Sequence, residues 1–104
     1  MTDLLTKTAP TLAELRAHRD EILALAEHYG AYNVRVFGSV ARGEATPDSD
    51  IDILVQFPVT YRLLHHAGLV SALKALLNHD VDVSVEQNLR TGYRDSILQD
   101  AVPL

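Results

Sequence analysis

The sequence predicts an α/β fold, with a small mixed β-sheet and helices packed on one of its faces. Three short apolar runs, each expected to be a strand, alternate with two longer stretches in which apolar residues recur at helical spacing. Apolar residues can occupy one side of every expected strand, so the helices can cover that side of the sheet. The length of 104 residues fits a single domain, residues 1–104, with one modest core.

Composition is that of an ordinary globular protein, with 47% hydrophobic and 22% charged residues. The absence of cysteine excludes a disulfide framework and a thiolate zinc site. No apolar run approaches the length of a membrane span, and the N-terminal residues do not resemble a signal peptide. We therefore expect a cytoplasmic protein that makes no membrane contact.

The net charge of −5 argues against extended nucleic-acid binding, which usually needs a basic face. The acidic balance does not exclude a nucleotide, because bound Mg²⁺ inverts the local field. A nucleoside triphosphate is thus a more plausible ligand than a polynucleotide.

The N-terminal part predicts a lead-in followed by one long helix. Residues 1–10 are expected to be loosely ordered. Thr11 is the expected N-cap, and Glu14 completes a capping box three residues later. The helix is expected to run to about Tyr29 and to stop at Gly30, a natural residue for the position after a helix.

The first strand, Asn33 to Phe37, ends at a Gly-Ser pair that could bind a phosphate. Gly38 permits a tight turn and close approach of a ligand to the backbone. Ser39 is the expected N-cap of a short helix whose free N–H groups could receive a phosphate. Arg42 lies one turn further on and could add a charge-assisted contact to the same phosphate.

The second strand, Asp50–Phe57, follows a turn-rich loop and begins with two alternating aspartates. Asp50 and Asp52 point to one face, about 6.5–7 Å apart along the strand, and repel each other unless a cation lies between them. Mg²⁺ suits such a pair. Taken alone, however, the pair also fits the polar edge of a half-exposed strand. Ser49 is expected to bond either the loop or an incoming phosphate.

A second long helix is expected from Thr60 to Asn78, with an unusually wide apolar sector. Most of this sector should cover the sheet, and its surplus width suggests that part of it contacts another protein. His65 and His66 are adjacent, cannot easily share an ion, and are expected at the surface. The apolar residues are Leu63, Ala67, Leu69, Val70, Leu73, Leu76 and Leu77.

The third strand, Val81–Val85, places valines on one face and Asp82 on the other. If the apolar faces of all three strands lie under the helices, Asp50, Asp52 and Asp82 share the opposite face. A metal site built from three carboxylates needs this arrangement.

A last helix is expected from Asn88, as its N-cap, to Asp100. Tyr93, Ile97 and Ala101 recur at helical spacing and are expected to form its inward side.

The segment G-S-V-A-R-G, followed by S-D-I-D on the next strand, resembles the signature of the DNA polymerase β-type nucleotidyltransferases. The whole chain, including its A-V-P-L tail, resembles the minimal nucleotidyltransferases, which are often antitoxin partners of HEPN-domain toxins. The resemblance implies that Gly38 and Ser39 grip a triphosphate, together with Arg42. It also implies that two Mg²⁺ ions are held by Asp50, Asp52 and Asp82.

The resemblance further implies transfer of AMP from ATP to a hydroxyl, expected to be a tyrosine, of a partner HEPN toxin. One ion would neutralise the departing pyrophosphate, and the other, with Asp82, would activate the acceptor hydroxyl. Two alternatives stay open. The chain could be a non-catalytic antitoxin that neutralises by binding, or a stand-alone nucleotidyltransferase acting on a small molecule.

Overall fold

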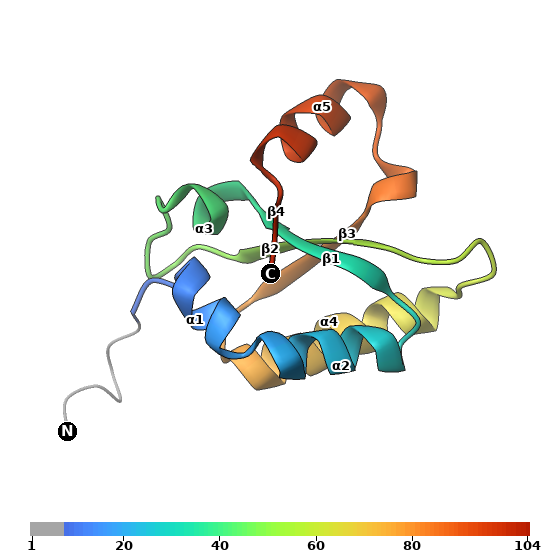
Figure 1. Cartoon of the computed structure of the whole chain (residues 1–104), viewed down its shortest axis with the longest axis horizontal. Helices are drawn as coiled ribbons and strands as arrows, with labels where there is room; N and C mark the ends of the chain where they lie inside the picture. The colour runs from blue at the N-terminus through green and yellow to red at the C-terminus, as the bar shows by residue number, and fades with distance from the viewer. Residues whose placement is uncertain (1–7) are drawn as a thin grey trace.

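A four-stranded mixed sheet in the order β3-β2-β1-β4 forms the middle of the molecule (Figure 1). The structure is a computed structural model that describes residues 8–104, so most of the expected lead-in lies outside the described residues. β1 (Tyr32–Phe37) pairs antiparallel with β2 (Ile51–Gln56), and β2 pairs parallel with β3 (Val81–Val85). The predicted α/β class and mixed sheet are confirmed.

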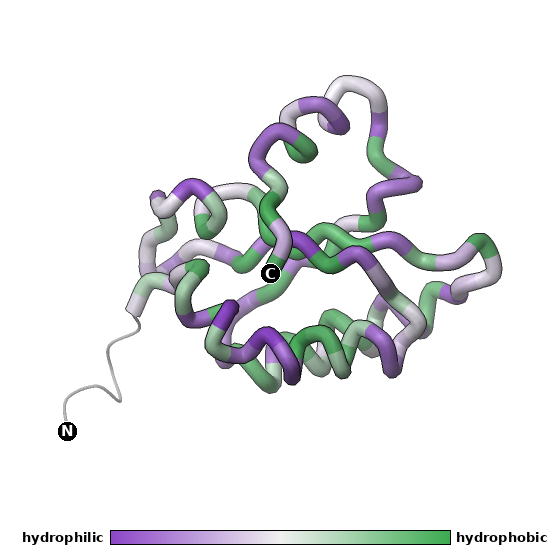
Figure 2. The backbone as a smooth tube through the Cα atoms, viewed as in Figure 1, coloured by the Kyte–Doolittle hydropathy of each residue, from purple (hydrophilic) through white to green (hydrophobic). Residues whose placement is uncertain are grey.

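Three helices cover one face of this sheet: α1 (Leu12–Ala17), α2 (Arg19–His28) and α4 (Leu63–Leu77) (Figure 1). Figure 2 shows hydrophobic residues recurring along the strands and along α4. The strands and helices meet in one core, because alternate strand residues all point toward the helices. Its fully buried members are Leu15, Ile22, Val36, Val40, Ile51, Ile53, Val55, Phe57, Leu69 and Leu73.

The predicted unbroken helix from Leu12 to Tyr29 is wrong, because the chain turns at His18 between α1 and α2. The N–H of His18 is shared between the carbonyl oxygens of Glu14 and Leu15, which tightens the last turn of α1. The helix start is confirmed, since Thr11 accepts a hydrogen bond from the Glu14 N–H. Gly30, with φ +84°, follows the end of α2 as expected.

α4 begins at Leu63, three residues later than predicted. The residues before it form a turn in which Tyr61 stacks on Phe57, with 4.4 Å between ring centroids. His66 is not a free surface residue, since its Nε2 donates to the Val83 carbonyl at 2.6 Å. α4 is therefore tied to the outer edge of β3.

The region after β3 departs most from prediction. A short 3-10 helix, η2 (Glu86–Asn88), precedes α5 (Thr91–Asp100), and Arg90 takes the N-cap position expected for Asn88. The Asn88 amide instead donates to the Tyr61 hydroxyl at 2.9 Å. Tyr93 is 65% exposed, so its predicted inward orientation is wrong.

β4 (Val102–Pro103) was not predicted, and it pairs antiparallel with β1. α5 leads into it and lies on the side of the sheet away from α1, α2 and α4 (Figure 1). The main helical layer is thus on one face, as predicted, while α5 packs beyond the other. Within residues 8–104, no helix combines the length and apolar character needed to cross a membrane.

Candidate active site

Two of the predicted carboxylates lie side by side on the sheet face opposite the core. Asp52 of β2 is in register with Asp82 of β3, and on its other side with Phe37 of β1. Residues directly opposite each other in neighbouring strands project on the same face. Asp50, predicted as the first residue of this strand, lies just before the observed β2 and is exposed. The structure thus brings Asp52 and Asp82 together and leaves Asp50 at the strand entrance.

Electrostatics show that these carboxylates act on one another. The pKa of Asp52 is raised to about 6, first by burial, then by the negative charges of Asp82 and Asp50. The nearby positive charge of Arg42 opposes this and lowers the pKa. Above pH 6 the site therefore concentrates negative charge that a bound cation would offset.

The Gly-Ser turn touches this cluster directly. Gly38 has φ +73°, and a Cβ built there would lie 2.3 Å from Oδ2 of Asp52. Both the backbone conformation and the approach to Asp52 thus require glycine. The turn that should receive phosphate lies against the carboxylate that should hold metal.

The short helix α3 (Gly38–Arg42) includes the Gly-Ser pair and begins two residues earlier than predicted. Phe37 takes the N-cap position and gives no side-chain cap, so the prediction that Ser39 is the N-cap is wrong. The left-handed Gly38 lets the chain enter the helix directly from β1. Val40, only 1% exposed, anchors α3 in the core.

Arg42 is held by two carboxylates in this structure. Its Nε donates to Glu44 at 2.9 Å, and its NH1 donates to Asp100 of α5 at 2.5 Å. These bonds raise the pKa of Arg42 further. Asp100 gave no sequence signal, because its contact with Arg42 depends on the placement of α5.

Ser49 forms the loop contact rather than leaving its hydroxyl free. The Ser49 hydroxyl accepts from the Thr46 N–H at 2.8 Å, and the Ser49 N–H donates to the Thr46 carbonyl at 3.0 Å. Of the two predicted alternatives, the hydrogen bond within the loop is the one present.

An ion-pair network that sequence reasoning missed supports the same face of the sheet. NH1 of Arg35 lies 2.5 Å from Oε1 of Glu86, and NH2 of Arg94 lies 3.3 Å from Oε2 of the same carboxylate. The Arg35 and Glu86 side chains are only 13% and 16% exposed. Because Arg35 belongs to β1 and Arg94 to α5, the network joins α5 to the sheet next to the carboxylates. Its one sequence signal is that Arg35 points away from the valine face of its strand.

The carboxylates fit a magnesium site that a substrate completes. Within residues 8–104, no group of three or more His, Cys, Asp or Glu side chains is arranged to hold a metal ion. Mg²⁺, however, commonly takes one or two carboxylates and fills its remaining positions with water and substrate phosphates. Asp52 and Asp82, with Asp50 at the entrance, would provide such a partial shell.

Comparison with known proteins identifies the family of the chain. A family model described as "Nucleotidyltransferase domain" matches residues 16–104. The chain therefore belongs to the nucleotidyltransferase domain family, as the sequence motifs predicted.

Individual relatives and solved structures are similar to the chain over most of its length. The chain is 41% identical over 88 residues to "Protein adenylyltransferase MntA" of Thermococcus cleftensis, covering 85% of this chain and 86% of the relative. A solved structure described as a minimal nucleotidyltransferase superposes with a TM-score of 0.82 at 48% identity, covering 91% of this chain and 97% of the other. A more distant neighbour, a toxin-antitoxin crystallised with AMP-PNP, shares the fold with a TM-score of 0.71 at 23% identity, over 81% of this chain and 69% of the other.

Proposed function

We propose that this nucleotidyltransferase transfers AMP from ATP to a hydroxyl group, expected to be a tyrosine, of a partner HEPN toxin, and so acts as its antitoxin. The observation that carries the proposal is the pairing of Asp52 with Asp82 directly beside the Gly38 turn. The 41% identical relative named as a protein adenylyltransferase supports a protein acceptor. A cytoplasmic location is part of the same proposal.

The residues divide the work of binding and activation. Asp50, Asp52 and Asp82 would hold two Mg²⁺ ions, which, when bound, offset the charge of the triphosphate and lower the pKa of the acceptor hydroxyl. Gly38 leaves room for phosphate oxygens next to Asp52, because it has no side chain there. Ser39 would donate its hydroxyl to the β- or γ-phosphate.

Arg42 would supply positive charge to the same phosphates. The Arg42 side chain is 44% exposed, and its charge already lowers the pKa of Asp52. The guanidinium therefore needs only to turn from Asp100 toward the ligand. The Ser49 hydroxyl, bonded within its loop, would contribute a phosphate contact only after leaving Thr46. The chain thus supplies position and charge, while the phosphoryl chemistry resides in the substrates.

Neutralisation by binding alone is a second candidate function. Three of the large exposed apolar side chains in the described residues lie together before and at the start of α4: Val59, Leu63 and Leu64. Such a patch can mask a partner without any chemistry.

Co-expression with the proposed partner toxin separates the two functions. Transfer of AMP should add about 329 Da to the intact toxin, given a partner held in line with the nucleotide. Asp82→Asn should abolish this increase, whereas the control Asp48→Asn, in the exposed loop before β2, should not. If the toxin is unmodified yet fully neutralised, and the Asp82→Asn variant protects equally well, the catalytic function is refuted and the chain neutralises by masking.

A further inference from the structure

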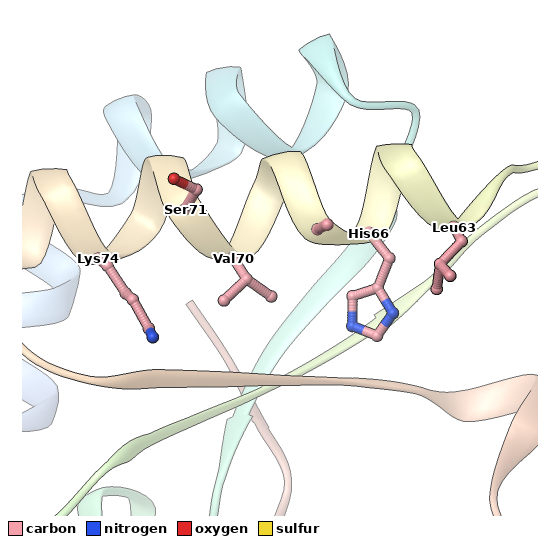
Figure 3. Close-up of a pocket in the computed structure, with 6 residues that line it drawn as sticks. Leu63, His66, Val70, Ser71 and Lys74 are labelled. Atoms are coloured by element: carbon pink, nitrogen blue, oxygen red, sulfur yellow. The ribbon is translucent and has the colours of Figure 1, made fainter.

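The side of α4 next to the edge strand β3 lines an open, mainly apolar groove of about 370 Å³. Figure 3 shows Leu63, His66, Val70 and Lys74 projecting from the same side of the helix. The residues that line the groove are Leu63, His66, Ala67, Val70, Ser71 and Lys74. Two further exposed apolar residues, Val59 (98% exposed) and Leu64 (80%), lie before and at the start of the same helix. This end of the helix therefore leaves much apolar surface in water.

An added β-strand cannot occupy this side of the molecule. β3 is the edge strand of the sheet, but the outward carbonyl of Val83 is already bonded to His66. Val81, Val83 and Val85, whose backbones face that edge, are each 5% exposed or less. An α-helix laid along α4 needs no backbone hydrogen bonds from the edge and can use the apolar groove directly.

The charge around the groove selects the partner. Residues 53–79 contain no Asp or Glu, although the chain has 14 acidic residues and a net charge of −5. The same stretch carries two basic residues, Arg62 just before the helix and Lys74 in the groove lining. A second copy would place the same positive residues opposite one another, whereas an acidic helix would complement them.

We propose that this groove docks an acidic amphipathic helix of the partner protein. The inference rests on the proposed function, because a protein acceptor must be held beside the nucleotide. α4 has 15 residues and is about 22 Å long, so a helix of about the same length would cover it. Lys74 marks the end nearest the active site, since its Nζ lies 4.0 Å from Asp80, two residues before Asp82. A partner docked here lies beside the strand that carries Asp82.

A designed peptide tests this surface without ATP or toxin. The probe is a fluorescein-labelled helix of about 15 residues with leucine along one face and glutamate elsewhere, matched to the length of α4. A second peptide has lysine in place of every glutamate. Fluorescence anisotropy is measured with the wild-type chain, with Ala67→Glu in the groove, and with the matched control Ala75→Glu, an exposed position on the same helix outside the groove.

The glutamate peptide should bind more tightly than the lysine peptide, and salt should weaken its binding. Ala67→Glu should weaken it about tenfold or more, as at a central interface position, while Ala75→Glu should change it by less than about twofold. No binding of the glutamate peptide, equal binding of both peptides, or equal effects of the two substitutions would overturn the proposal. If single-stranded RNA competes with the peptide, the groove binds RNA and the proposal is overturned. If the chain self-associates and Ala67→Glu abolishes the association, the groove binds a second copy and the proposal is likewise overturned. Asp82→Asn should bind the peptide like the wild type, so loss of the proposed catalysis and loss of this docking site are separate results.

Discussion

Replacing Asp52 by asparagine should stabilise the metal-free protein, and should do so only at higher pH. The folded protein raises the pKa of this carboxyl from 3.8 to about 6, first through burial and then through Asp82 and Asp50. Each pKa unit of difference between the folded and the unfolded state corresponds to about 1.4 kcal/mol for a fully buried group. Because the Asp52 side chain is partly exposed, solvent screening reduces the total to about 1 kcal/mol.

The sign follows from the protons bound in each state. Below pH 3.8 the carboxyl is protonated in both the folded and the unfolded chain, and it costs nothing. Between pH 3.8 and 6 the folded state binds more protons, so the free energy of unfolding falls as the pH rises. Above pH 6 the full penalty remains, and the Asp52→Asn variant escapes it.

Thermal melting in a chelating buffer, from pH 4 to pH 8, measures this difference. The melting temperature of the Asp52→Asn variant minus that of the wild type should be about 4–8 °C larger at pH 8 than at pH 4. This is the shift expected for about 1 kcal/mol in a domain of this size. The control Asp48→Asn, in the exposed loop, should show no such pH-dependent gap. Adding Mg²⁺ should stabilise the wild type and leave the Asp52→Asn variant nearly unchanged.

A gap that does not depend on pH, or a variant that melts lower than the wild type at pH 8, would refute the reasoning. Either result would mean that Asp52 serves packing or hydrogen bonding rather than metal binding. Activity alone could not make this distinction, since both roles predict its loss.

Three further predictions follow from the same site. Gly38→Ala should lower the free energy of unfolding, measured in denaturant titrations, by about 2–4 kcal/mol, because it adds a clash with Asp52 to the strain of a positive φ. The control Gly43→Ala should cost only about 1–2 kcal/mol, because Gly43 has the same φ of +73° but nothing within 4 Å. Mg²⁺ should raise the affinity for ATP about tenfold or more in calorimetric titrations, and equal affinity without the ion would contradict the metal assignment. Arg42→Ala should weaken ATP binding in the same titrations, while Asp100→Asn, which removes only the ion pair between α3 and α5, should cost no more than about 1 kcal/mol of stability and leave ATP binding intact. Equal loss of ATP affinity in both variants would show that the ion pair, rather than a phosphate contact, explains the role of Arg42.

The sequence was sufficient for the parts of the fold that depend on local alternation. β3 was predicted at its observed bounds, because three valines alternate with Asp82 and Ser84 over five residues. The same alternation placed Asp52 and Asp82 on one face before their register was known. A period of two along a strand is a property of the backbone itself, so sequence reasoning can use it directly.

The features that sequence reasoning missed depend on contacts between distant segments. β4 has only two residues, one of them proline, which is too short for any periodicity and fits only the edge of a sheet. The bond from Arg42 to Asp100 spans 58 residues and exists only because α5 returns across the sheet. α4 begins at Leu63, after a turn in which Tyr61 stacks on Phe57, and helix propensity cannot report such a packing contact.

The core and the active site are opposite faces of the same strands, and this ties the register of the sheet to the chemistry. A slip of β3 by one residue would turn Asp82 into the core and bring a valine to the metal face, because successive side chains alternate. Burying one unpaired carboxylate and exposing the valines would cost far more than the repulsion that Asp52 and Asp82 tolerate in the observed register. The apolar face thus holds the carboxylates in a row even when no cation is present to relieve them. Burial first, and then the neighbouring carboxylates, make the charge on Asp52 unfavourable, and the melting experiment on Asp52→Asn measures this combined cost.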